Sequence, residues 1–218
     1  MARFNVANAD NYGGQGGGGY FSLKEDKETA QVRFLYDTVD DIEGFAVHEI
    51  PDKNSNSPYA KKSVNCLREY GAPVDDCPFC KAGKPVKVKY FVPIWNIKEN
   101  RMQTWERGKK FGGRLSSMCS RYPHLYTHIF EIERQGASGS TETQYEIWET
   151  GQTDVKLEDF GEIQNPLGSH VLDKSAEDMQ YYLDRGSFMD DENTATPARD
   201  EQQYIRRTPA NTNRREVF

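Results

Sequence analysis

Three cysteines and a histidine within the first 80 residues have the types and order of ligands for a metal ion. Cys77 and Cys80 form a C-x2-C motif, which Cys66 and His48 precede in the chain. Zinc prefers thiolate and imidazole ligands, and structural zinc sites hold four of them in a tetrahedron. The pattern therefore predicts one structural zinc ion per chain, bound by His48, Cys66, Cys77 and Cys80.

Other roles for these cysteines remain open. A redox-active C-x-x-C pair normally accompanies a βαβ pattern, which is missing here, and unrelated buried thiols are a further alternative. A catalytic zinc would keep an open coordination position and need an acid–base partner, for which the sequence has no H-x-E-type motif. If His48 is only packed in its strand, the fourth ligand would come from Cys119, His124 or His128.

The charge of the chain is distributed unevenly. The whole chain has a net charge of −6, but residues 81–124 contain eleven Lys or Arg and two Glu, a local charge of +9. Residues 1–80 carry −5 and residues 125–218 carry −10. A basic block between acidic flanks indicates a local surface for a polyanion, and nucleic acid is the first candidate.

Aromatic residues are interleaved with the cations of this block. In the strand expected over residues 86–97, one face is apolar, whereas Lys87, Lys89, Phe91 and Trp95 share the other. Cations that follow phosphates and rings that stack on bases are typical of single-strand binding. The alternative is that the rings of the strands fill a second hydrophobic layer. The nucleic-acid-binding candidates are Lys87, Lys89, Phe91, Trp95, Trp105, Arg107, Lys109, Lys110, Phe111 and Arg114.

Short β-strands are expected to position these residues. Apolar alternation and β-branched or aromatic residues predict most of the strands. A helix is expected near residues 111–122, and a capping box at Ser175 and Asp178 predicts another over 173–186. Several strands with few helices favour a mainly β fold, most simply an OB-fold-like small barrel with an embedded zinc subdomain. The strands are expected at residues 32–36, 44–50, 64–67, 86–97, 101–107, 125–134 and 143–150.

The chain is expected to comprise a folded core and two tails. Glycine-rich residues 1–19 predict a disordered arm, and polar residues 187–218 predict a disordered tail. Between them we expect an OB-fold core at 20–172, with the zinc subdomain around 48–85, followed by the helix at 173–186. No run of about 18 apolar residues and no signal-like N-terminus is present, so we expect a cytoplasmic protein with reduced cysteines.

The order of several stretches within residues 20–115 resembles a known family. These stretches resemble the zinc-containing, helix-destabilising single-stranded-DNA-binding proteins of T-even phages. The resemblance implies an OB-fold, a structural zinc and a non-enzymatic protein that coats DNA in phage replication, recombination and repair, in the host cytoplasm. It is carried by Leu23–Asp26, Val32–Leu35, the strand ending at His48, Asn65–Cys66, Asp76–Cys80, the strand through Tyr90 and Trp95, and Arg107–Phe111.

The resemblance also implies self-association on DNA and recruitment of replication or recombination proteins. The acidic segment 177–192 is the candidate surface for such partners. The chain departs from the family at both ends. The family's N-terminal arm is basic, whereas the glycine-rich arm here has Arg3 alone, and the family's acidic C-terminus is replaced by a stretch containing Arg206, Arg207, Arg214 and Arg215.

The competing functional class is a zinc-ribbon nuclease or a polymerase accessory subunit. A nuclease would need clustered carboxylates to bind Mg²⁺. The dense acidic group before the basic block is Asp37, Asp40, Asp41 and Glu43, which is more typical of a solvated turn. A thiol oxidoreductase is a third class, and it would show reversible oxidation of Cys77 and Cys80.

Overall fold

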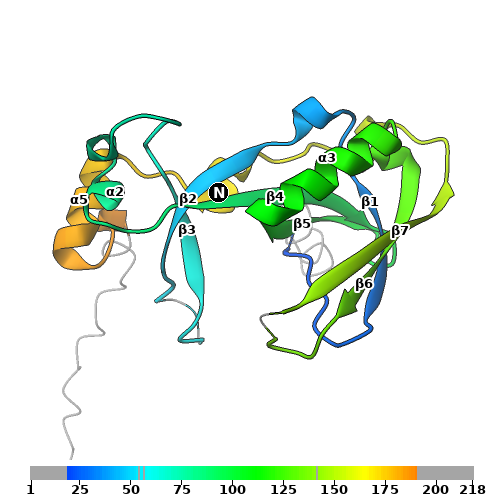
Figure 1. The fold of residues 1–218 in the computed structure, drawn as a ribbon, viewed down its shortest axis with the longest axis horizontal. Coiled ribbons are helices and arrows are strands. Elements are labelled where there is room, and N and C mark those ends of the chain that lie inside the picture. The colour runs from blue at the N-terminus through cyan, green and yellow to red at the C-terminus, as the bar shows by residue number, and fades with distance from the viewer. Residues whose placement is uncertain (1–18, 54, 56, 141, 191–218) are drawn as a thin grey trace, which may run out of the picture.

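The structure is a computed structural model that describes residues 19–190 apart from residues 54, 56 and 141. Residues 1–18 and 191–218, which contain most of the expected arm and tail, lie outside the described part. Figure 1 shows an elongated molecule with two lobes. The larger lobe contains α3 and strands β1, β5, β6 and β7, and the smaller one contains α2 and α5.

The strands form one sheet of eight, in the order β7-β6-β1-β4-β2-β3-β8, with β5 paired to β4 beside this path. Neighbours are antiparallel except β3 and β8, which are parallel. Among the described residues no pairing joins the two ends of this order, so the sheet is open. The mainly β prediction is confirmed. The strands are β1 (Thr29–Phe34), β2 (Gly44–Pro51), β3 (Lys61–Asn65), β4 (Lys87–Asn96), β5 (Arg101–Gly108), β6 (His128–Gln135), β7 (Gln144–Gln152) and β8 (Val171–Leu172).

Strand β4 connects the two lobes because it has three partners. On one edge it pairs with β5 from Lys89 to Asn96. On the other edge its first half pairs with β2 and its second half with β1. The sheet therefore continues from the larger lobe into the smaller one through β4 and β2, as Figure 1 shows.

The larger lobe is held by a core that α3 (Gly112–Arg121) covers. Leu115, Met118 and Cys119 are the buried residues of α3, at the three- and four-residue spacing of a helix face. The sheet contributes large apolar side chains, of which Trp105 and Phe34 are at most 1% exposed. The core is thus shared by residues from β1, β4, β5, β6 and the helix.

The smaller lobe has its own apolar cluster, built around α2 (Pro78–Lys81) and α5 (Ala176–Arg185). The capping box of Ser175 and Asp178 starts α5, as the sequence predicts, and Gly186 ends it with φ 76°. Phe188 is 1% exposed and packs in this cluster. Packing therefore continues beyond residue 186, where the tail was expected to begin.

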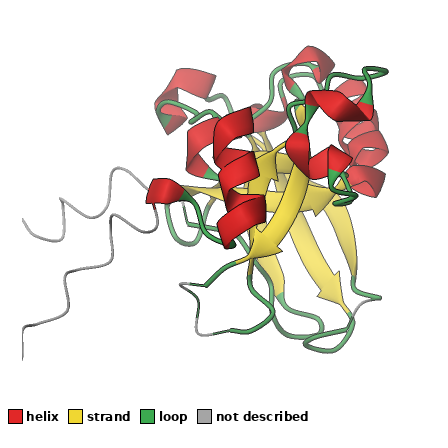
Figure 2. Cartoon of the chain, turned by 90° about the vertical axis from the view of Figure 1, so that its left-hand side faces the viewer, coloured by secondary structure: helices red, strands yellow, loops and turns green. Residues whose placement is uncertain are grey.

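Short elements complete the fold, and Figure 2 shows the helices gathered over one end of the twisted sheet. The segment α4 (Pro166–Ser169) and β8 covers the face of β4 that is opposite the main core, where His170 stacks on Phe91 with ring centroids 5.7 Å apart. No helix in the described part is long and apolar enough to cross a membrane. The single-turn 3-10 helices are η2 (Val39–Asp41), η3 (Val74–Asp76), η4 (Lys109–Phe111), η5 (Leu125–Thr127) and η6 (Leu157–Phe160).

Candidate metal centre and nucleic-acid interface

Three elements of the smaller lobe bring the predicted metal ligands together. His48 lies on β2, and Cys66 directly follows β3. Cys77 is the N-cap of the one-turn helix α2, and Cys80 lies within that helix. Pro78 is the first residue of this helix, where its fixed φ and missing N–H are favourable. The turn is closed by the Lys81 amide, which donates to the Cys77 carbonyl at 3.0 Å. Both sulfurs of the motif therefore come from one rigid turn.

The four ligand atoms form a compact group, all within 4.8 Å of one another. Cys66 Sγ lies 3.6 Å from Cys80 Sγ, and His48 Nε2 lies 3.5 Å from Cys77 Sγ and 3.6 Å from Cys80 Sγ. All the cysteines are free, and the 3.6 Å separation is far longer than a disulfide bond. The arrangement is compatible with a metal site. Within the described ranges no other group of three or more such ligands is brought together.

Neighbouring groups orient the imidazole and enclose the sulfurs. His48 Nδ1 lies 3.2 Å from the Pro85 carbonyl oxygen, so a proton there leaves Nε2 free to face the sulfurs. Burial lowers the pKa of His48, which favours the neutral ring that a metal requires. Phe79 packs edge-on against this ring, and Met179 of α5 brings its sulfur to 3.9 Å from Cys77 Sγ.

Without a cation, burial disfavours an ionised thiol in this group, and the pKa values of Cys77 and Cys80 are shifted in opposite directions. Burial and the adjacent Cys66 thiol raise the pKa of Cys80 to about 12. Burial also opposes ionisation of Cys77, but backbone N–H groups, led by that of Cys80, outweigh it and lower the pKa of Cys77. A positive ion among the sulfurs would remove this conflict, since coordination deprotonates thiols.

The substitute ligands lie in the larger lobe. Cys119 is a residue of α3 that is buried in the main core, and His128 packs beside Tyr122 and Phe130. His124 contacts Asp37. His48 is therefore the histidine that the fold places with the three cysteines.

A basic hollow of about 470 Å³ lies at the junction of β5, η4, α3 and the start of β7. Four cations and two aromatic rings line it, and five of these six residues were predicted nucleic-acid contacts. Lys109 and Lys110 are exposed, and neither has an ion-pair partner among the residues that the structure describes. The hollow is lined by Arg107, Gly108, Lys109, Lys110, Phe111, Arg114, Thr143, Gln144 and Tyr145.

The two arginines of the hollow are held in place by Tyr145. The Arg107 guanidinium lies 4.5 Å from the centre of the Tyr145 ring and 4.6 Å from that of Trp105. Arg114 donates to the Tyr145 carbonyl oxygen at 2.6 Å. Burial lowers the pKa of both arginines, although guanidinium remains charged at any physiological pH. The hollow thus has two positive charges that contact Tyr145 and two on exposed lysines.

A smaller hollow of about 180 Å³ continues along the same helix and shares Arg114. Its lining also includes Arg121, Tyr122 and the carboxylate of Glu149. The sequence did not single out these residues or Tyr145. Tyr145 is an aromatic position in the expected strand 143–150, but no neighbouring motif identified it.

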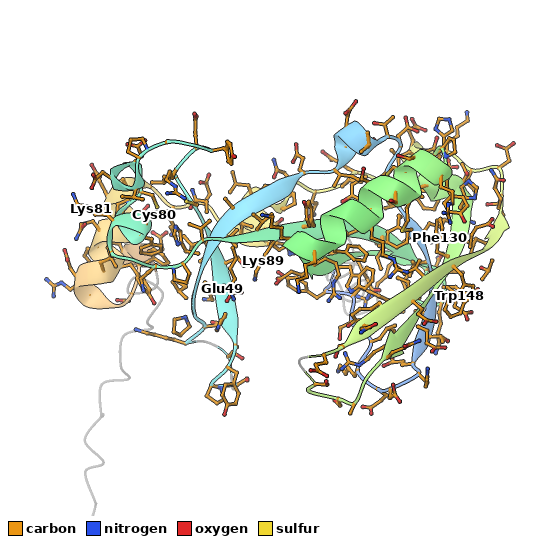
Figure 3. The ribbon with its side chains drawn as sticks, in the orientation of Figure 1. Glu49, Cys80, Lys81, Lys89, Phe130 and Trp148 are labelled. Carbon is orange, nitrogen blue, oxygen red and sulfur yellow. The ribbon has the colours of Figure 1, made fainter. Side chains whose placement is uncertain are left out.

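The cations at the start of β4 are paired with carboxylates. Lys89 is 9% exposed, and its ammonium lies 2.9 Å from Glu49 and 2.7 Å from Glu106. Lys87 also pairs with Glu49, at 2.7 Å. Burial would raise the pKa of Glu49, but hydrogen bonds from Lys87 and Lys89 lower it to about 2. Figure 3 shows Glu49 and Lys89 near the crossing of β2 and β4, where they join the two lobes.

The structure corrects the expected surface position of two aromatic rings, Trp105 and Phe91. Trp105 is 1% exposed because it pairs with Val92 in the register of β4 and β5, on the face that lines the main core. Phe91 is 4% exposed beneath His170, and Trp95 is half-buried against Phe160, 5.3 Å away. The alternative of a second hydrophobic layer therefore holds on β4, because the chain after β7 folds back over its outer face.

Comparison with known proteins adds no assignment: no protein-family model matches the chain, and no curated protein matches its sequence.

Proposed function

We propose that this chain binds single-stranded DNA without sequence preference, coating and protecting it during phage DNA replication, recombination and repair. The basic hollow is the observation that carries the proposal. Its cations can contact phosphates, and its half-buried rings, Phe111 and Tyr145, pack against the main core and line the hollow, where a base could stack. The role is that of a binding protein rather than an enzyme.

Single-stranded DNA fits the hollow better than a duplex does. A ring can stack only on a base whose face is free, which requires an unpaired strand. Phosphates and π-faces occur in every nucleotide, so a surface that uses them binds all sequences. The adjoining hollow at Arg121 and Tyr122 extends the same combination of cation and ring along α3. We infer that a strand crosses both hollows, with Arg114 between them.

Zinc is the proposed metal, as one structural ion per chain. For Zn–S near 2.3 Å and Zn–N near 2.05 Å, a tetrahedron places two sulfurs about 3.8 Å apart and sulfur and nitrogen about 3.6 Å apart. The separations of 3.6 Å between Cys66 and Cys80, and of 3.5 and 3.6 Å from His48, are close to these values. Four protein ligands complete the tetrahedron, so the bound ion would stabilise the smaller lobe.

The finer description of the fold belongs to the same proposal. Strands β1, β4, β5, β6 and β7 surround the core around Trp105, and α3 covers it. We propose that these strands and α3 form an OB-fold-like barrel, with the metal lobe inserted between β2 and β4. Barrels of this class bind oligonucleotides on their strand faces and adjoining loops.

The test is the binding of a fluorescein-labelled dT oligomer to the native protein, followed by fluorescence anisotropy. We expect binding at low salt, with a duplex of the same length bound more weakly. Phe111→Ala should weaken dT binding by roughly 5- to 150-fold, because the loss of one stacked base costs about 1–3 kcal/mol of binding free energy. Phe160→Ala, which removes a half-buried ring outside the hollow, is the matched control and should bind as the native protein does.

The same oligomer distinguishes the competing classes. Absence of dT binding at low salt, or equal binding by both phenylalanine variants and the native protein, would contradict the proposal. Incubation with Mg²⁺ should leave the oligomer intact, whereas its degradation would favour a nuclease. Metal analysis of the purified chain should give one zinc per protein molecule.

A further inference from the structure

A second pocket of about 470 Å³ has the opposite electrostatic character from the basic hollow. We call it the acidic pocket. It lies between the start of β2, the middle of β4 and the segment before α4. Among the described residues that line it, none is basic. The lining consists of Leu35, Tyr36, Asp37, Asp41, Glu43, Phe45, Phe91, Pro93, Leu157, Ile163, Gln164, Asn165 and Pro166.

The floor of the acidic pocket is apolar. Leu35 and Phe91 are buried at its base, and Phe45 packs edge-on against Phe91 with ring centroids 5.8 Å apart. Ile163 remains 37% exposed at the margin. A pocket with apolar walls and an open mouth favours an apolar side chain as occupant.

Carboxylates surround this floor. Asp41 and Glu43 are exposed, and Asp41 is fixed by backbone amides of Asp37 and Thr38 that donate to it at 3.0 and 2.7 Å. The carboxylates around the floor repel a polyanion. A ligand that carries a guanidinium beside an apolar group can pair with the carboxylates and pack on the floor. The pocket is therefore complementary to a short peptide that combines arginine with aromatic or aliphatic residues.

The C-terminal part of this chain has that composition. Residues 202–218 contain four arginines and one glutamate, in a protein with a net charge of −6. The four-residue stretch Tyr204–Arg207 reads Tyr-Ile-Arg-Arg. Residues 191–203 separate it from Asp190, the last described residue, and a tether of this length can span up to about 50 Å.

We propose that Tyr204–Arg207 dock in the acidic pocket of the same chain. Tyr204 and Ile205 contact the apolar floor, and Arg206 and Arg207 pair with the carboxylates of Asp41 and Glu43. The tether supplies an effective concentration in the millimolar range, so weak contacts suffice for occupancy. Exposed ion pairs are individually weak and are screened by salt, so docking is reversible and weakens as salt rises.

Photo-cross-linking of the full chain tests the proposal without DNA. Position 204 is replaced by the photoreactive amino acid p-benzoyl-phenylalanine (Tyr204→Bpa), and equal amounts of normal and ¹⁵N-labelled protein are mixed before irradiation. Mass spectrometry should then locate cross-links at residues 35–45 or 157–166 of the same copy. Arg206→Gln/Arg207→Gln, which leaves the described residues unchanged, should reduce their yield at least several-fold, as should 0.5 M NaCl.

A pair of acidic variants provides the matched comparison. Asp41→Asn/Glu43→Gln should reduce the cross-links, and asparagine keeps an oxygen that can accept the backbone amides. Glu69→Gln/Glu177→Gln removes the same charge from exposed sites outside the pocket and should leave the yield of cross-links unchanged. Cross-links to the basic hollow, links only between different copies, or a yield that the arginine variant does not change would overturn the proposal. None of these outcomes depends on whether the chain binds DNA.

Discussion

Replacing Lys109 and Lys110 by glutamine should lower the salt dependence of DNA binding by about two fifths. These lysines are two of the five cations that line the two hollows, with Arg107, Arg114 and Arg121. The logarithm of the affinity for a single strand falls with the logarithm of salt by about 0.7 per neutralised phosphate, so five contacts give a slope of about −3.5 and three give about −2.1. Between 50 and 200 mM salt, the native protein should lose about 130-fold in affinity and the variant about 18-fold.

The assay is a series of anisotropy titrations with labelled dT oligomer across this range of NaCl. Both lysines are exposed, so the thermal unfolding curve of the variant should match that of the native protein. Lys81→Gln/Lys98→Gln is the control, since it removes the same charge outside the hollow and should preserve the slope. If the two double variants have the same slope, these cations do not contact phosphates and the reasoning fails.

Three further predictions concern the metal, the helix start and the charge network. Removal of the proposed zinc ion with a chelator should abolish amide-exchange protection in α2 and α5 while the β6–β7 pair stays protected, because the ion would join the elements of the smaller lobe. Unchanged exchange in α5 would contradict this. Gly112→Ala should lower the free energy of unfolding in urea by about 1–3 kcal/mol, because its Cβ would lie 2.3 Å from Tyr90 Oη, whereas Gly113→Ala meets open space and should be neutral or stabilising. The pKa of Glu49 is lowered from 4.5 to about 2, so its contribution to stability is present above pH 4.5 and is lost as pH falls towards 2. Glu49→Gln should therefore flatten the pH dependence of the urea midpoint between pH 4.5 and 2. An unaltered profile would count against the charge network.

The metal-ligand cluster could be predicted from sequence because its signal is local. The C-x2-C motif fixes two ligands in one turn, and the strand pattern placed His48 and Cys66 on neighbouring extended segments. The register His48↔Val64 and Val47↔Asn65 then brings them side by side. Most strands were also predictable, since alternation of apolar residues marks β2, β4 and β5 within a few residues of their observed ends.

The outer face of β4 could not be predicted from its own alternation. The pattern correctly separated two faces, but it does not tell which partner covers the second face. That partner is the segment around Phe160 and His170, which has little periodicity and lies more than 60 residues further along the chain. Lys89 is buried on the same face by a different contact, because Glu49 and Glu106 approach it from two other strands.

Two functional contributions depend on long-range packing that leaves no local motif. The helix α5 was predicted as a separate element, yet Met179 and Phe188 pack against the turn that contains Cys77 and Phe79. Tyr145 lines the basic hollow because the start of β7 lies beside α3. There its ring contacts Arg107. Such contacts follow from the tertiary arrangement rather than from residue spacing.

The most direct test of the central claim is ultraviolet cross-linking of a dT oligomer to the native protein, mapped by mass spectrometry. We predict cross-linked peptides that contain Phe111 and Tyr145, with loss of the Phe111 cross-link in Phe111→Ala. Cross-links confined to the metal lobe or to the acidic pocket, or none at low salt, would contradict the proposed single-strand-binding surface.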